Sequence, residues 1–143
     1  MRSRDDYRHF LTLPTRWQDN DVYGHINNAA YYGFIDTAVN RYLIDGGFLD
    51  WDRGEIVGLV VENGCRFAKP MTFPDPVDVG LCVTRIGNSS VRYEAGLFSA
   101  SDRDAAAEAY YIHVYVDRAT MRPRPLPGML RDLLAPLSIS KTE

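Results

Sequence analysis

The stretch Arg16–Leu43 reads RWQDNDVYGHINNAAYYGFIDTAVNRYL, and the rest of the chain is organised around it. Its first third is a polar loop. Five of the loop's positions fall within eight residues: Asp21, Gly24, His25, Asn27 and Asn28. The remainder, from Ala29 to Ile44, has no proline, one early glycine and mostly apolar side chains, which predicts a helix. The first N–H groups of a helix lack intrahelical partners, so such a helix start can stabilise an anion or a developing oxyanion.

The predicted helix has clear limits and a narrow polar side. Asn27 or Asn28 can cap its start, and the next strong break is Asp45-Gly46-Gly47. Apolar residues cover more than one face. The polar strip consists of Asp36, Thr37, Asn40 and Arg41. Such wide apolar coverage predicts a helix wrapped by a sheet rather than one lying on the surface.

The remaining segments alternate between apolar and polar residues, as β-strands do. A first strand is predicted over 7–17, at an edge or bulge because it contains Pro14. Later elements follow in chain order: strands over 55–68 (kinked near Asn63-Gly64), 77–86, 90–100 and 105–117, a short helix over 128–134 and a mobile tail over 138–143. This order predicts one α+β domain over 1–143, a curved antiparallel sheet wrapped around one long central helix.

Composition limits the classes of function. The chain has 143 residues and a net charge of −3, without a long basic run, which argues against nucleic acid as the main partner. No apolar run is long enough for a membrane span, and no secretory signal is evident at the N-terminus. Cys65 and Cys82 are isolated, so we interpret both as reduced, buried strand cysteines of a cytoplasmic protein. No set of residues has the spacing of metal ligands, and no cofactor is predicted.

The loop and helix together carry a wider pattern. It comprises Arg16, Asp19, Asp21, Gly24-His25-x-Asn27-Asn28, Tyr31 and Asp36. This pattern resembles the signature of hotdog-fold acyl-CoA thioesterases, in the 4-hydroxybenzoyl-CoA thioesterase branch. Further similarity covers nearly the whole chain, at 67–70, at the turn 86–90, at the strand ending 113–117 and at the Pro-rich lead into the last helix.

The resemblance implies a hotdog fold and hydrolysis of an acyl thioester, usually acyl-CoA, in a homodimer or homotetramer with sites between subunits. In this branch the acid preceding x-x-Gly is the nucleophile or general base, and it corresponds to Asp21. The backbone N–H that polarises the thioester carbonyl corresponds to Asn28. Gly24, which allows the tight turn, and His25 complete the candidate catalytic set.

The candidate substrate-binding residues are Asn27, Tyr31 and Tyr32, although Asn27 can also cap the helix and the tyrosines can also be core residues. For His25, hydrogen bonding to the loop backbone is the structural alternative. Asp36 is the runner-up nucleophile, because a second hotdog branch places an acid in a D-T-A context at a similar point of the helix. By default Asp36 is solvated or paired, for example with Arg41.

Two further residues are interpreted structurally: Asp19 as a neighbour of Asp21, and His113 as a satisfied strand histidine. Two other functions stay open, a thioesterase acting on acyl carrier protein and a non-catalytic hotdog protein that binds acyl-CoA or lipid. Hydration is disfavoured, because 20–25 lacks the proline and the acid spacing of hotdog hydratases. The sequence does not identify the acyl group.

Overall fold

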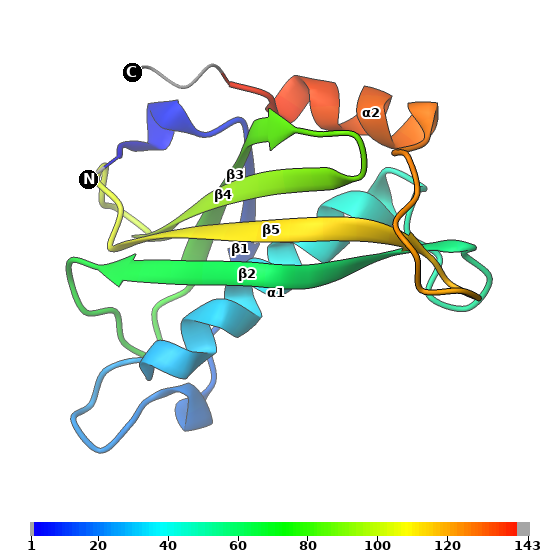
Figure 1. Cartoon of the computed structure of the whole chain (residues 1–143). Helices are drawn as coiled ribbons and strands as arrows, with labels where there is room; N and C mark the ends of the chain where they lie inside the picture. The colour runs from blue at the N-terminus through cyan, green and yellow to red at the C-terminus, as the bar shows by residue number, and fades with distance from the viewer. Residues whose placement is uncertain (1, 140–143) are drawn as a thin grey trace.

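A computed structural model describes residues 2–139, which form five strands, two α-helices and three short 3₁₀ helices. Figure 1 labels the strands and the α-helices. In chain order the elements are η1 (Arg4–Asp6), β1 (His9–Leu13), η2 (Trp17–Asp19), α1 (Asn28–Asp45), β2 (Ile56–Phe67), β3 (Val77–Ile86), β4 (Ser90–Ser99), β5 (Ala107–Asp117), α2 (Gly128–Leu134) and η3 (Ala135–Leu137). The prediction of an α+β chain with one strand, a helix and four more strands is therefore confirmed.

The five strands form one antiparallel sheet in the order β1-β3-β4-β5-β2. The short first strand is at one edge, as Pro14 predicted, and β2 is at the other. The pairing of β2 with β5 shifts between Val60 and Glu62, which leaves Val61 as an extra residue. The irregularity in this strand thus precedes the kink expected at Asn63-Gly64.

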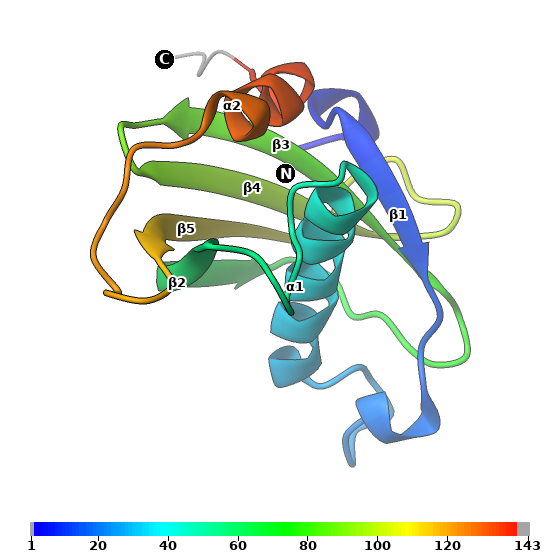
Figure 2. The same cartoon turned by 90° about the vertical axis from the view of Figure 1, so that its right-hand side faces the viewer.

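Helix α1 spans 18 residues and lies along one face of the sheet, nearest to β3 and β4 (Figure 2). Its fully buried residues are Tyr31, Ile35, Ala38, Val39 and Leu43. They pack against the alternate residues of the strands that face the helix, such as Val79, Leu81 and Leu97, none of which is exposed to solvent. Removing these apolar side chains from water is the main favourable term in folding.

The opposite face of the sheet is covered in part by the N-terminal segment. The ring of Tyr7 lies over Gly80 and Gly96, where a Cβ atom would come within 2.9 Å and 2.6 Å of it. Strand β1 begins at His9, two residues later than predicted. At its other end the predicted strand is also too long, since Trp17 begins η2.

The C-terminal segment is better ordered than predicted. Helix α2 has the predicted bounds, but η3 follows it directly. The N–H of Ile139 then donates to the carbonyl of Val83 at 2.9 Å, so 138–139 is attached to β3 rather than mobile. The rest of the predicted tail, 140–143, lies outside the described residues. Within 2–139, no helix combines the length and the apolar character needed to cross a membrane.

Candidate active site

The polar loop before α1 is closed by its own backbone. The N–H of Asn27 donates to the carbonyl of Asp19 at 2.8 Å, and the N–H of Asp21 donates to the carbonyl of His25 at 2.9 Å. Gly24 has a φ of +80°, in the region that glycine occupies at low cost, and its N–H donates to the carbonyl of Asp21. These bonds hold the loop acid beside the start of the helix.

The carboxylate of Asp21 is half-buried and only partly used. One oxygen, Oδ1, accepts the N–H of Tyr23 at 2.8 Å, and the other has no hydrogen-bond partner in the described part of the chain. The residue lines a surface pocket of about 770 Å³. The other lining residues are Trp17, Gln18, Asn20, Val22, Tyr23, Gly24 and Asn27. A free carboxylate oxygen at a pocket can attack an electrophile or accept a proton from water.

The second loop acid, Asp19, has a different role. It is only 4% exposed. One of its oxygens accepts the backbone N–H of Arg16 at 2.8 Å, and the other pairs with the Arg16 guanidinium at 2.9 Å. Because both oxygens are engaged, Asp19 braces the turn that precedes the loop. The interpretation of Asp19 as a structural neighbour of Asp21 is confirmed.

At the helix start, the N–H groups of Ala29 and Ala30 are occupied by Asn27, and that of Asn28 is available. The side chain of Asn27 caps the helix by accepting the N–H of Ala29 at 2.9 Å. For the N–H of Asn28, the first residue of α1, no acceptor occurs among residues 2–139. This N–H points out of the positive end of the helix macrodipole, a setting that stabilises negative charge on a nearby oxygen.

Three other predicted residues lie around this helix start. His25 is exposed and contributes its backbone carbonyl to the loop. Tyr31 is 3% exposed and packs edge-on against Phe67 with 5.0 Å between ring centroids, and its burial raises its pKa. Tyr32 is half-buried, and its carbonyl accepts the hydroxyl of Tyr111 at 3.0 Å. Both tyrosines thus lie between α1 and the β2–β5 side of the sheet.

The runner-up acid is away from the loop. Asp36 lies on the third turn of α1 and is exposed. Of the two default states, the exposed side chain agrees with solvation, and within residues 2–139 Arg41 contacts Asp45 at 3.4 Å, one helical turn further on, rather than Asp36. Burial raises the pKa of Tyr111, and the negative charge of Asp36 adds to that shift. Asp36 therefore faces the same side of the helix as Tyr111.

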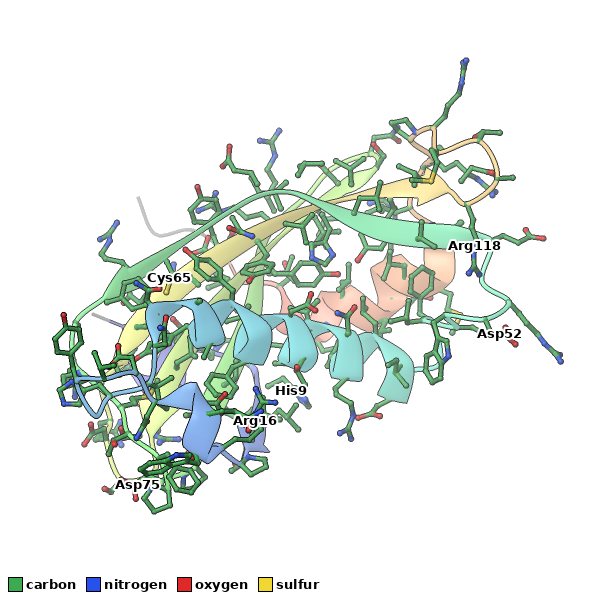
Figure 3. The ribbon with its side chains drawn as sticks, turned by 90° about the horizontal axis from the view of Figure 1, so that it is seen from below. His9, Arg16, Asp52, Cys65, Asp75 and Arg118 are labelled. Atoms are coloured by element: carbon green, nitrogen blue, oxygen red, sulfur yellow. The ribbon has the colours of Figure 1, made fainter. Side chains whose placement is uncertain are left out.

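Figure 3 shows how β2 and β5 run along the helix. Cys65 lies at the end of the sheet beside the start of α1, whereas Arg118 and Asp52 lie at the opposite end (Figure 3). Both cysteines are free, as predicted, but only Cys82 is fully buried. Burial raises the pKa of each thiol to about 11, so neither is a reactive thiolate at neutral pH. Residues 2–139 contain no group of three or more His, Cys, Asp or Glu side chains arranged to hold a metal ion.

The interpretation of His113 as a satisfied strand histidine is wrong. It is 4% exposed on β5, and neither ring nitrogen has a hydrogen-bond partner in the described structure. Burial lowers its pKa to about 4, so the ring is neutral at pH 7. The only signal in the sequence is one polar residue within YYIHVYV, and that pattern does not reveal whether the ring finds a partner.

Comparisons with known proteins give a consistent result. A family profile described as the thioesterase-like superfamily matches residues 15–134. The long-chain acyl-CoA thioesterase FadM of Escherichia coli (strain K12) is 24% identical over 115 residues, which cover 80% of this chain and 87% of FadM. The crystal structure of the PA5185 protein from Pseudomonas aeruginosa strain PAO1 is 49% identical, with a TM-score of 0.95 and 99% of both chains covered. A thioesterase from Thermus thermophilus, complexed with coenzyme A and Zn, is 27% identical, with a TM-score of 0.76 and coverage of 93% of this chain and 96% of that one.

Proposed function

The chain belongs to the thioesterase-like superfamily, and on that premise we propose that it hydrolyses an acyl-CoA thioester to the free acid and CoA. The observation that carries the proposal is a pair of unused polar atoms on one closed loop. These are the second carboxylate oxygen of Asp21 and the backbone N–H of Asn28. The first supplies a nucleophile or base, and the second is a donor for the thioester oxygen.

Two routes use the same residues. In the first, a carboxylate oxygen of Asp21 bonds to the thioester carbon, the C–S bond breaks, and CoA leaves as the thiolate. Water then hydrolyses the resulting anhydride. In the second, Asp21 takes a proton from water as the hydroxide adds to the carbonyl, and the proton passes to the leaving sulfur. In both, negative charge grows on the carbonyl oxygen, where one well-placed N–H donor is worth about 3 kcal/mol.

We assign CoA as the thiol because two similar proteins have names that connect them with it, an acyl-CoA thioesterase and a thioesterase complexed with coenzyme A. Gly24 provides the turn, His25 braces it through its carbonyl, and Asn27 orients the helix start. Tyr32, beside the open β2 edge, lines the site of the acyl group, and Tyr31 supports Tyr32 from the core. No cofactor is assigned. Two free thiols suit a reducing compartment such as the cytoplasm.

We further propose a hotdog arrangement in which α1 is the central helix and two copies meet through β2, as a homodimer or a pair of such dimers. An edge strand offers unpaired backbone groups, and this one also exposes Leu59, Val60 and Val61, at 37%, 42% and 61%. Exposed apolar side chains on an edge strand favour burial against a second copy. The partner would then cover the open side between β2 and α1.

The catalytic assignment is tested by thiol release from a panel of benzoyl, hydroxybenzoyl and short-, medium- and long-chain acyl-CoAs. Wild type is compared with Asp21→Asn and Asp36→Asn. We expect Asp21→Asn to lower kcat by roughly 10²–10⁴-fold, the range for removal of an acid or base. The amide keeps an acceptor for the Tyr23 N–H, so the variant should remain folded. Asp36→Asn is the matched control, because it makes the same change on the helix.

Each contrary outcome has a distinct meaning. A selective loss in Asp36→Asn moves the nucleophile to the helix. Turnover of acyl carrier protein thioesters but not of acyl-CoAs changes the substrate class. Tight binding of acyl-CoA without turnover by wild type identifies a binding protein and overturns the enzymatic proposal.

The dimer is tested by sedimentation velocity. We expect wild type to sediment with the mass of at least two chains and Val61→Lys to shift toward the monomer, because each copy would bury an unpaired charge. Met129→Lys on α2 is the control, since Met129 is similarly exposed at 52% but lies away from β2. A monomeric wild type, or equal dissociation of both variants, contradicts assembly through this strand.

A further inference from the structure

One polar group beneath α1 has no partner, although all its polar neighbours do. The hydroxyls of Tyr93 and Tyr115 bond to each other at 2.6 Å, and the hydroxyl of Tyr111 donates to the carbonyl of Tyr32. These three tyrosines surround His113, with ring centroids 5.0 to 6.4 Å from its own. Both nitrogens of His113 remain without a hydrogen bond among residues 2–139.

An unpaired group at this position is energetically unfavourable. A buried polar group without a partner destabilises a fold, and this ring has two such atoms. The neutral imidazole offers one donor and one acceptor. A hydroxyl can donate to the acceptor nitrogen or accept from the N–H, and a keto oxygen can accept from the N–H, whereas an apolar chain end leaves both nitrogens unsatisfied.

The ring lies one strand in from the open edge of the sheet. His113 is in register with Val60 of β2, which is 42% exposed. Its Nδ1 atom is 3.2 Å from the position that a Cβ atom would occupy on Gly58, an exposed position of the same strand. Because Gly58 has no side chain, the backbone of β2 and the exposed side chain of Val60 are what lie between the ring and the open side next to α1.

The position along the helix sets a distance from the proposed reaction centre. Tyr111, two residues before His113, lies beside Tyr32 near the start of α1, and Tyr115, two residues after it, lies beside Phe48 past the helix end. Tyr32 is four residues, about 6 Å, along the helix from Asn28. His113 is two residues, about 6.5 Å, further along β5 than Tyr111, so its ring lies on the order of 12 Å from the N–H of Asn28.

We propose that His113 is a specificity-determining residue that hydrogen-bonds to a hydroxyl or keto oxygen carried by the acyl group about 12 Å from the thioester carbonyl. The substrate class is thus an oxygenated medium-length acyl thioester rather than a plain fatty acyl or a single-ring aryl thioester. This proposal rests on the proposed function, since it places the thioester at Asn28. It also gives the two unpaired ring nitrogens a function.

The test compares decanoyl- and dodecanoyl-CoA with their ω-hydroxy counterparts, whose extended chains span about that distance. The variants are His113→Phe, His113→Gln and, as a control, His9→Phe. His9 also packs against a tyrosine, Tyr42, but lies on the opposite edge strand. For wild type we expect kcat/KM to favour the hydroxylated substrate by roughly tenfold, the worth of one buried hydrogen bond.

We expect His113→Phe to abolish this preference while still hydrolysing the plain substrate, His113→Gln to restore part of it, and His9→Phe to keep it. Equal losses on both substrates in His113→Phe indicate a merely structural histidine and overturn the proposal. So does a wild type without preference.

A second measurement separates this proposal from the proposed function. The imidazole ¹⁵N resonances of His113 are followed while ω-hydroxydodecanoic acid or dodecanoic acid is added. A shift with the hydroxy acid alone supports recognition by His113 even if no thioester is hydrolysed. The absence of a shift with either acid, or the same shift with both, overturns it.

Discussion

The loop of residues 19–28 and the β5 surface beneath α1 each leave one polar side chain incompletely hydrogen-bonded. The loop does so at the surface, and the β5 surface does so in the interior. In the loop, backbone bonds and the side chains of Asp19 and Asn27 make the structural contacts, which leaves one carboxylate oxygen of Asp21 unused at a pocket. Beneath the helix, the hydroxyls of Tyr93 and Tyr115 bond to each other and leave His113 without a partner in the buried interior. An unpaired group exposed to water costs little, whereas a buried one lowers stability.

A polar atom without a partner indicates function for different reasons at the surface and in the interior. At the surface, a free polar atom is ordinary, and Asp21 stands out only because the N–H of Asn28 and a pocket lie on the same loop. In the interior, a free polar atom is rare enough to require an explanation of its own. The predictions below test whether the two regions differ as their surroundings imply.

The largest expected stability effect concerns His113 and pH. Its pKa is about 4 in the fold against an ordinary value of 6.5, because burial disfavours the charged ring. The unfolded chain therefore binds a proton between pH 6.5 and 4 that the folded chain does not, so stability falls as the pH falls through this window. At about 1.4 kcal/mol per pH unit, the loss is about 3 kcal/mol. The groups that face the ring are Tyr93, Tyr111 and Tyr115, whose pKa values burial raises, so they stay neutral throughout.

The measurement is urea unfolding of wild type and His113→Phe at pH 7 and pH 4. Carboxylates titrate in both proteins, so the variant is the internal control for them. We expect the free energy of unfolding to fall about 3 kcal/mol further in wild type than in the variant. Parallel declines in the two proteins would mean that the ring is protonated inside the fold, and that water or a charge reaches it.

The same contrast explains what could be predicted from sequence. Helix α1 was predicted to within one residue at each end, because Asn27 and Gly46 are local capping signals, and β3 has the predicted bounds 77–86. The proposed role of Asp21 follows from a local motif and its resemblance, and the structural role of Asp19 follows from its place in the same loop. The state of His113 and the partner of Arg41 could not be predicted, since they depend on which side chains the fold brings near them. The early start of the β2 irregularity, at Val61, is likewise a matter of register with β5.

A smaller effect distinguishes the two acids within the loop. In Asp19→Asn, one carboxylate oxygen becomes an NH₂ group that faces either the N–H or the guanidinium of Arg16, both of which are donors. Water screens the charge attraction because the Arg16 side chain is 67% exposed, so the clash of donors dominates. We expect a loss of about 2 kcal/mol in the free energy of unfolding. Asp21→Asn keeps its one acceptor and should change stability by less than about 0.5 kcal/mol.

Urea unfolding at pH 7 measures both variants, with Asp5→Asn as the reference for a fully solvated ion pair. Asp5 and Arg103 contact at 2.8 Å, but their side chains are 81% and 72% exposed, so little stability should be lost. Under conditions where Asp19→Asn is still folded, it should retain turnover that Asp21→Asn lacks. If instead Asp21→Asn proved the less stable of the two, its carboxylate would be a structural element of the loop, and the free oxygen at the pocket would no longer argue for catalysis.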